Sequence, residues 1–396
     1  MRMIPDPRCD RKKKHDYAEI IVCLIAAYLA GRTTLRRALR WCHTHINVLR
    51  DGLMLSGGIP SLSTVSRLLS TINEEDFCNA FMQWMTELLK TQAAHIIIDG
   101  KALRGATERI KKGNTPYILN AIEAATNLVV AQIAIDTKEN EKTAIPRLLD
   151  LLSLKDSLVT IDAIGTTTDI IQKIAEKGAH YLLTIKKNQP TTYKEIMQYF
   201  DSHIILKENH YQTSEKNRER MEYREIKRSQ FISQISSTDR YPNLKQFALL
   251  EQVRIKIEKD DDGRNITPNK EIYLKQGTVR KPQISTGDQA TDDRYRIGLV
   301  TDTGLSPKDM LEIKRKHWKI ENGLHHVLDD TLREDRSPAR KSKNNLALIR
   351  KFVFNILQIA KIREESSLGF PETMDSFADD SNKIRSYVLE GIESFY

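Results

Sequence analysis

The chain has 396 residues, 40% of them hydrophobic and 29% charged, and a formal net charge of +9 with a pI near 9.1. This composition is that of a soluble globular protein long enough for two or three domains with their own cores, and it excludes a membrane-spanning class. The excess of Lys and Arg agrees with a polyanionic partner, but basic proteins without nucleic-acid partners are common, so charge alone does not decide.

The cysteines exclude a zinc-binding protein, and the acidic residues before the first apolar run exclude a secretory signal peptide. Cys9, Cys23, Cys42 and Cys78 form no C-x-x-C pair and have no matching histidine cluster, so we expect reduced thiols in a cytoplasmic protein rather than a zinc site. Residues 11–31 look like a signal peptide. The acidic residues Asp16 and Glu19 interrupt the approach, however, and the apolar run is too short to cross a bilayer, so a buried amphipathic helix is predicted.

Residues 1–90 are predicted to form a helical N-terminal domain, because apolar residues recur there at spacings of three and four, and we expect this domain to bind DNA. In the segment 57–69, "GGIPSLSTVSRLL", Ser61 or Ser63 can cap a helix that exposes Ser63 and Arg67. Two interpretations stay open: a DNA-reading helix of a helix-turn-helix, or a serine-capped helix with a solvated polar face.

The periodicity changes after residue 91. Strands are expected at 94–100, 116–124 and 127–136, a helix at 141–152, a strand at 157–165, a helix at 166–178 and a strand at 179–188. This order, β-β-β-α-β-α-β, is that of ribonuclease H-like nuclease folds. We therefore predict an α/β fold in which residues 91–200 form the first part of a ribonuclease H-like catalytic core.

The remainder of the chain is predicted to be a β-rich insertion followed by the second part of the core. The insertion covers residues 201–293, with strand-like stretches at 247–257 and 271–277 and a turn at 260–263. Residues 294–365 return to the core with a strand, an acidic helix over 306–332 that Ser306 and Pro307 begin, and a long apolar-striped helix over 344–362. Residues 366–396 are expected to be a peripheral C-terminal tail.

Two aspartates share an unusual setting, because Asp99 and Asp162 each end an apolar strand run and are followed closely by glycine. In a ribonuclease H-like sheet the first and fourth strands are neighbours, so the two carboxylates are expected side by side at one edge. Two like charges repel each other unless divalent cations neutralise them, and Mg²⁺ is a hard ion that prefers such oxygen ligands.

A third carboxylate is expected from Glu321. Ile320, Leu324 and Val327 form an apolar stripe at helical spacing, and Glu321 lies at its margin. Each acid also has a purely structural interpretation, as a turn former, a helix cap or a solvated side chain. The joint pattern favours a metal-dependent phosphodiester enzyme. Spacing alone does not exclude the competing acids Asp329, Asp330, Glu334 and Asp335.

These residues also carry a family resemblance. The blocks "DGKALRGA", "VTIDAIG" followed by "KGAHYLLTIKKNQ", and "HWKIENGLHHVLDDTLREDRS" followed by "NNLALIRKFVFNIL" resemble, in order, the motifs of the H-repeat-associated group of bacterial insertion-sequence transposases, in the DDE superfamily. The resemblance extends over about residues 4–363. It implies a ribonuclease H-like core interrupted by the β-rich insertion, with Asp99, Asp162 and Glu321 as catalytic acids and metal ligands.

The resemblance also implies chemistry and partners. Such an enzyme cuts element ends and joins their 3′-hydroxyls to target DNA with two Mg²⁺ (or Mn²⁺) ions per site, about 3.5–4 Å apart. Its partners are double-stranded DNA and, on bound ends, a second copy in a homodimer; its place is the cytoplasm, at the nucleoid. The residues expected to contact DNA are Lys101, Arg104, Lys186, Lys187, Asn188, Gln189, His317, Trp318, Asn322, His325, Ser63 and Arg67.

Each of these contacts has a structural alternative, since exposed lysines also keep a surface soluble and Trp318 can pack in the core instead of bracing a base. Two alternative functions stay open as well. One is a catalytically silent DNA-binding remnant that recognises element ends, and the other is a ribonuclease H-like nuclease that cuts without joining.

Overall fold

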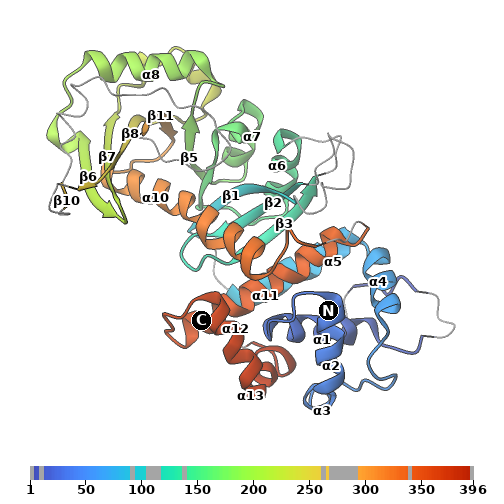
Figure 1. The fold of residues 1–396 in the computed structure, drawn as a ribbon. Helices are drawn as coiled ribbons and strands as arrows, with labels where there is room; N and C mark the ends of the chain where they lie inside the picture. The colour runs from blue at the N-terminus through green and yellow to red at the C-terminus, as the bar shows by residue number, and fades with distance from the viewer. Residues whose placement is uncertain are drawn as a thin grey trace. The chain divides into compact units, whose positions relative to one another are not determined.

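A computed structural model describes residues 4–8, 13–89, 94–103, 117–135, 141–259, 265–266, 293–337 and 341–392. The chain divides into two compact units, the first made of residues 1–157 and 317–396 and the second of residues 158–316 (Figure 1). The first unit is therefore built from both ends of the chain.

The first unit begins with helices, as predicted. They are α1 (Tyr17–Leu29), α2 (Leu35–Thr44), α3 (Ile46–Leu49), α4 (Leu62–Thr71) and α5 (Glu74–Leu89). The run that resembles a signal peptide is α1, a core helix whose first turn is capped by the Asp16 carboxylate accepting from the backbone N–H groups of Ala18 and Glu19. None of the helices in the described ranges is long and apolar enough to cross a bilayer.

An antiparallel sheet follows in the same unit, in the order β3 (Val129–Ile135), β2 (Tyr117–Glu123), β1 (His95–Ala102). Helix α6 (Glu141–Asp150) packs on β2 and β3, and α5 also contacts β3. The turn between β2 and β3 contains Asn127 at a positive φ of 59°, a conformation that asparagine tolerates. The predicted strand, turn and helix positions are confirmed here.

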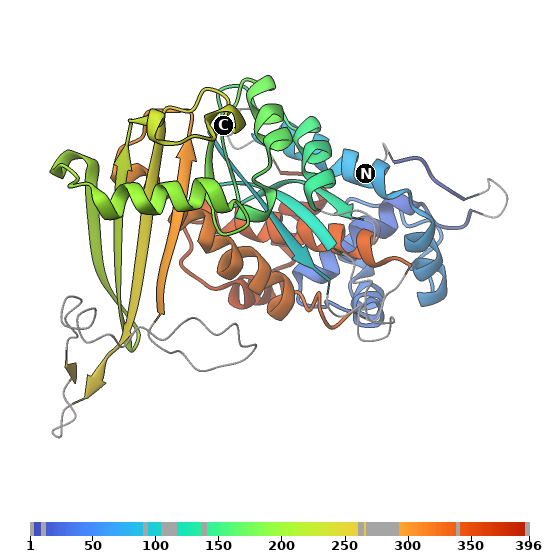
Figure 2. The ribbon, with the colours of Figure 1, turned by 90° about the horizontal axis from the view of Figure 1, so that it is seen from above.

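The second unit contains a six-stranded mixed sheet. Its order is β4 (Leu158–Ile161), β5 (His180–Ile185), β11 (Asp293–Thr301), β8 (Gln246–Lys256), β7 (Arg220–Ser229), β6 (His210–Asn217). Helix α7 (Thr168–Glu176) links the parallel strands β4 and β5. Helix α8 (Pro190–Ser202) contacts β8 and β11 and runs across the strands (Figure 2).

The predicted β-rich insertion differs from its expected form. Its strand at 247–257 is confirmed as β8, but β8 pairs with β11, so the insertion extends the sheet of this unit instead of standing apart. The charged run 215–228, for which no strand is predicted, lies in the hairpin β6–β7. Alternation explains this, since Glu222, Arg224 and Ile226 face inward together. The short strands β9 (Glu258–Lys259) and β10 (Asn265–Ile266) follow, and the stretches 260–263 and 271–277 lie outside the described residues.

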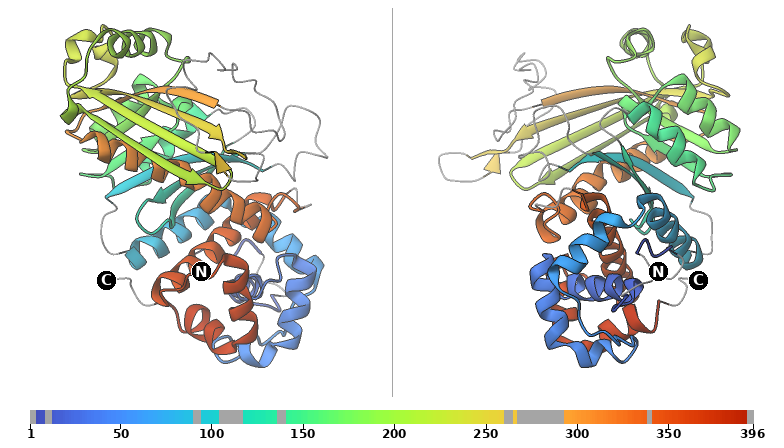
Figure 3. Two further views of the ribbon diagram at one scale, coloured as in Figure 1. Left: turned by 60° about the vertical axis from the view of Figure 1, so that its left-hand side comes forward. Right: turned by 90° about the vertical axis from the view of Figure 1, so that its right-hand side faces the viewer.

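The acidic helix begins as α10 (Pro307–Ile320) and continues in two π-helical turns, η6 (Glu321–His325) and η7 (Val327–Thr331). After it, α11 (Lys343–Arg363) is almost wholly buried. The segment expected to be a peripheral tail forms α12 (Phe370–Asp379), α13 (Ser381–Ile384) and the π turn η8 (Arg385–Leu389). Figure 3 shows these C-terminal helices beside the N-terminal ones; α12 contacts α1 and α11 and buries Met374 and Phe377, so this segment is part of the core.

Candidate active site

Asp99 is the fifth of the eight residues of β1 and follows three isoleucines, Ile96 to Ile98, that are almost fully buried. The sequence prediction that the strand ends at Asp99 is therefore wrong, because Gly100, Lys101 and Ala102 continue the pairing with β2. These side chains anchor the strand, and the Asp99 carboxylate keeps 24% of its surface exposed. At Gly100 an added Cβ would collide with the Tyr117 ring, so only glycine allows β2 to approach this closely.

His325 is a titratable group that faces Asp99, with its Nε2 atom 3.7 Å from the carboxylate Oδ2. Burial, together with the ammonium groups of Lys101 and Lys351, lowers the pKa of His325 to about 4, although Glu334 acts in the opposite direction. The imidazole is therefore neutral at pH 7 and does not cancel the charge of Asp99.

Asp162 directly follows β4 and precedes the short 3-10 helix η2 (Ala163–Gly165). Its side chain makes no capping hydrogen bond, which argues against the interpretation of this residue as a simple helix cap. The Lys186 Nζ atom donates to its Oδ1 over 3.0 Å. Burial would raise the pKa of Asp162, but the charges of Lys186 and Lys314 and the Ala163 backbone N–H together lower it, so the carboxyl group is ionised at neutral pH.

The loop after β5 supports Asp162 from one side. Asn188 Nδ2 donates to the Ala163 carbonyl over 2.7 Å, and the Gln189 amide donates to the Thr166 carbonyl. Of the four residues that sequence predicts as DNA contacts in this loop, Lys186, Asn188 and Gln189 thus hold Asp162 or the turn behind it. Lys187 is exposed.

Lys314 is a positioning residue that the sequence reasoning missed. It is 3% exposed, and its Nζ donates to Thr184 Oγ1 of β5 over 2.9 Å. The signal was present in the sequence, because Lys314 lies three and four residues after Leu311 and Met310, both buried, and thus on the apolar face of α10. A buried ammonium there adds positive charge beside Asp162.

Glu321 occupies the first position of the π turn η6, and its side chain is exposed. Ile320, Leu324 and Val327 are all buried, so the predicted apolar stripe with Glu321 at its margin is confirmed. Single π turns inside helices occur often at functional sites. The side chain of Asn322 lies outside the described part of the chain.

Glu334, one of the competing acids, belongs to a buried ionic cluster. Its carboxylate accepts from Lys101 Nζ over 2.6 Å and from Lys351 Nζ over 3.3 Å, and Lys101 also donates to Asp329. Burial would raise the pKa of Glu334, but Lys351, Lys101 and Arg350 lower it to about 2. Glu334 is thus an internal ion-pair partner, and Lys101, expected at phosphate, faces carboxylates here.

The other predicted DNA contacts differ in exposure. His317 is buried and Trp318 half-buried, while Arg104 lies outside the described residues. Ser63 and Arg67 are exposed on α4, and the helix is capped by Ser61, whose Oγ accepts from the Thr64 backbone N–H over 3.3 Å.

Comparisons with known proteins place the chain in a family. The sequence profile described as Transposase DDE domain matches residues 90–352, and the one described as DDE_Tnp_1-associated matches residues 1–85. The chain belongs to the Transposase DDE domain family. This confirms the resemblance to the H-repeat-associated transposases.

Two relatives of this transposase-family chain cover most of its length. It is 28% identical to the "H repeat-associated putative transposase YhhI" of Escherichia coli strain K12, over 98% of this chain and 96% of the relative. It is 29% identical to the "Putative transposase YncI" of Escherichia coli O157:H7, over 91% of this chain and 86% of that relative. A solved piggyBac transposase synaptic complex with hairpin DNA aligns with 95% of this chain at a TM-score of 0.39 and 10% identity, a likeness too low to carry an argument.

The region of the transposase matched by the associated profile contains a second basic helix that sequence reasoning did not select. Arg36, Arg37 and Arg40 are exposed on one side of α2, while the opposite side buries Ala38, Leu39, Trp41 and Cys42. None of these three arginines has an acidic partner in the described part of the chain. The pattern "LRRALRW" carries the signal, since it places the arginines on the face away from the apolar residues.

The donor chemistry around Asp99 suits a divalent cation. Asn120 pairs directly with Asp99 in the β1–β2 register, is fully buried, and has no hydrogen-bond partner for its side-chain amide among the described residues. Side-chain amide and carboxylate oxygens are hard donors. Within the described ranges no group of three or more His, Cys, Asp and Glu side chains is assembled for a metal ion, and the convergence of Asp99, Asp162 and Glu321 stays a prediction.

Proposed function

We propose that the chain is a DNA transposase of a bacterial insertion sequence that cuts element ends and joins the 3′-hydroxyls to target DNA. Asp99, Asp162 and Glu321 are its catalytic acids. The observation that carries this proposal is the setting of Asp162, within a chain of the Transposase DDE domain family: an ionised carboxylate at a strand end, used for no helix cap and braced by Lys186.

The proposed catalytic core is ribonuclease H-like. The element order from β1 to β5, three strands, α6, β4, α7 and β5, supports this assignment. In such a core β1 and β4 are neighbours, so Asp99 of β1 and Asp162 directly after β4 would lie close together. The π turn would then bring Glu321 to the same place.

We infer two Mg²⁺ or Mn²⁺ ions as cofactors, held by the three carboxylates, with the Asn120 amide oxygen as a further donor near Asp99. When bound, the ions would activate the attacking water or 3′-hydroxyl and stabilise the leaving oxygen. The donor set supports a hard divalent cation, because all of its atoms are oxygens. The Lys186 ammonium group donates to Asp162 Oδ1 and would orient this carboxylate.

The residues of the chain itself would position and charge the site. Lys186, Asn188 and Gln189 fix the strand end and turn around Asp162, and the buried cluster around Glu334 fixes the segment after the π turns to β1. Neutral His325 adds no positive charge beside Asp99. Lys187 is exposed, and its ammonium group would contact a DNA phosphate.

The proposed partner is double-stranded DNA, at the element ends and at the target, bound by a homodimer. We infer that α2 supplies phosphate contacts through Arg36, Arg37 and Arg40, with Ser63 and Arg67 of α4 as further contacts. Their exposure supports this role, and an arginine face without acidic partners gains from releasing the counterions of DNA.

The test is to incubate the purified protein and Mg²⁺ with DNA that carries the sequences flanking its coding region, which should contain inverted repeats. The expected result is cutting at the element ends, followed by products in which those ends are joined to a second DNA. Binding without cutting in any divalent metal would favour the silent DNA-binding remnant, and cutting without joined products would favour the nuclease.

A further inference from the structure

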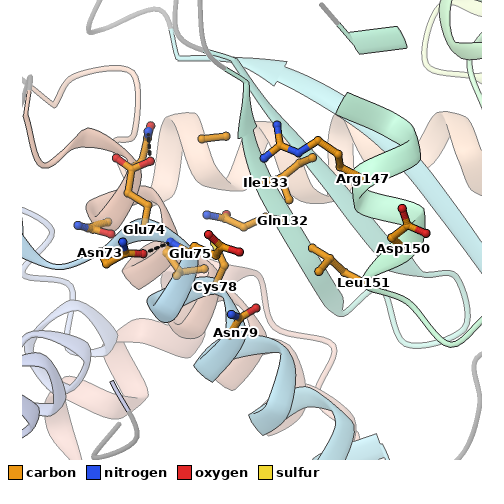
Figure 4. A pocket seen from close by; sticks show the side chains of 14 residues that line it. Asn73, Glu74, Glu75, Cys78, Asn79, Gln132, Ile133, Arg147, Asp150 and Leu151 are labelled. Atoms are coloured by element: carbon orange, nitrogen blue, oxygen red, sulfur yellow. Dashed lines mark hydrogen bonds between the residues drawn. The ribbon is translucent and has the colours of Figure 1, made fainter. Parts of the chain in front are cut away.

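A cavity of about 620 Å³ lies in the first unit and is lined by none of the acids considered so far (Figure 4). It is bordered by α5, β3, the end of α6 and the start of α11. The residues that line the cavity therefore come both from the helical region matched by the associated profile and from the region matched by the Transposase DDE domain profile. Its volume is in the range of small-ligand sites, about 300–1,000 Å³.

Two amide oxygens at this cavity lack hydrogen-bond donors. Gln132 is 2% exposed, and its Oε1 atom has no hydrogen-bond partner among the described residues. Its side chain forms a hydrogen bond with the Cys78 thiol. Figure 4 shows Gln132 reaching from β3 toward the side chains of α5. Asn344 Nδ2 donates to Glu74 Oε2 over 2.7 Å, but the buried Oδ1 of Asn344 has no partner in the described structure. Buried acceptors without donors are costly, so a ligand that carries N–H groups would gain by donating to them.

The negative charge of the residues that line the cavity favours a cationic ligand. Three carboxylates, those of Glu74, Glu75 and Asp150, border the cavity, and Arg147 offsets one of them. This excess of negative charge stands out in a chain of net charge +9 and disfavours a DNA phosphate at this place. The apolar side chains of Ile133 and Leu151 form the rest of the wall and suit methylene groups.

We propose that this cavity binds an aliphatic polyamine. Its ammonium groups donate to Gln132 Oε1 and Asn344 Oδ1 and pair with Glu74 and Glu75, while its methylene chain packs on the apolar wall. A bound polyamine bridges α5 to β3 and thereby links the helical region to the transposase domain. The site is independent of the proposed DNA chemistry and of its metal ions.

Cys78 provides a direct reporter, because its half-buried thiol lines the cavity whereas Cys23 and Cys42 are fully buried. The full-length protein, without DNA or metal, is treated with methyl methanethiosulfonate, and modification of each cysteine is followed by peptide mass spectrometry. Spermidine should slow Cys78 modification saturably, by about tenfold once it exceeds its Kd tenfold. Tetramethylammonium at equal ionic strength is a cation without an N–H donor and should not protect Cys78.

Variants test the assigned contacts. Gln132→Met replaces the unpaired amide with an apolar group of similar shape, and Glu75→Gln removes one charge; both should weaken protection while circular dichroism stays unchanged. Glu87→Gln, an exposed position on the same helix but outside the cavity, should behave like the wild type. Equal protection by both cations, no protection by spermidine, or full protection in Glu75→Gln would overturn the proposal. None of these outcomes depends on transposase activity.

Discussion

The buried cluster around Glu334 offers the sharpest stability prediction. Glu334→Gln keeps the shape of the side chain and removes its charge. Lys351, which is fully buried, and Lys101, which is 6% exposed, then lose the carboxylate that they share. Breaking a buried ion pair from one side leaves uncompensated charges in a medium of low polarity, which is strongly destabilising.

The magnitude follows from the shift in pKa. The pKa of Glu334 falls from 4.5 to about 2 in the folded protein, because the pull of Lys351, Lys101 and Arg350 exceeds the effect of burial. That difference corresponds to about 3 kcal/mol of unfolding free energy at neutral pH, within the range of about 3–5 kcal/mol for broken buried pairs. A folded pKa below the unfolded one stabilises above pH 4.5 and loses this contribution as the pH falls toward 2.

Urea denaturation followed by tryptophan fluorescence measures this effect in the right place, since Trp41, Trp84 and Trp318 all lie in the first unit with Glu334. The variant should lose about 3 kcal/mol at pH 7, and its difference from the wild type should shrink below pH 4.5. Glu321→Gln is the matched control, because that side chain is exposed and its replacement should leave stability unchanged. A change of less than about 0.5 kcal/mol in Glu334→Gln would refute the reasoning, since that is the scale of ordinary surface substitutions.

Three further predictions concern other parts of the molecule. Lys186→Met removes the support of Asp162 and should lower the rate of end cutting about 10–100-fold, as for residues that orient metal ligands, whereas Lys187→Met should leave Asp162 in place and weaken DNA binding instead. Replacing Arg36, Arg37 and Arg40 by alanine should reduce the slope of log affinity against log salt by about 0.9 for each DNA phosphate that is no longer neutralised, which filter binding at several salt concentrations measures; an unchanged slope would exclude α2 from the DNA interface. Gly100→Ala should destabilise the first unit by about 1–3 kcal/mol in the urea experiment, because the new methyl group meets the Tyr117 ring, and Gly323→Ala, in the same unit and with nothing within 4 Å, is its control.

Local patterns in the sequence predicted much of the structure. Apolar runs and the alternation of apolar and polar residues predicted the positions of β1 to β5, because neighbouring residues alone determine these patterns. The position of Asp162 at a strand end could likewise be predicted, since only a few consecutive residues define it, whereas β1 continues three residues past Asp99. The same holds for the Glu321 margin of an apolar stripe.

Contacts between distant residues could not be predicted in this way. Lys101 has the sequence pattern of a surface lysine, but its partners Asp329 and Glu334 lie 228 and 233 residues further along the chain. The insertion has the sequence pattern of a separate region, because no local signal tells that β8 pairs with β11. The C-terminal segment is polar in composition, yet Met374 and Phe377 are enough to seat α12 in the core.

The central claim is that Asp99, Asp162 and Glu321 act together in DNA cutting and joining. The most direct measurement is strand transfer of element-end DNA in Mg²⁺ by Asp99→Asn, Asp162→Asn and Glu321→Gln, each beside a gel-shift with the same DNA and an Asp330→Asn control. We expect the three variants to bind DNA like the wild type but neither to cut nor to join it, while the Asp330→Asn control does both. Strand transfer by any of the three at the rate of the wild type would contradict it.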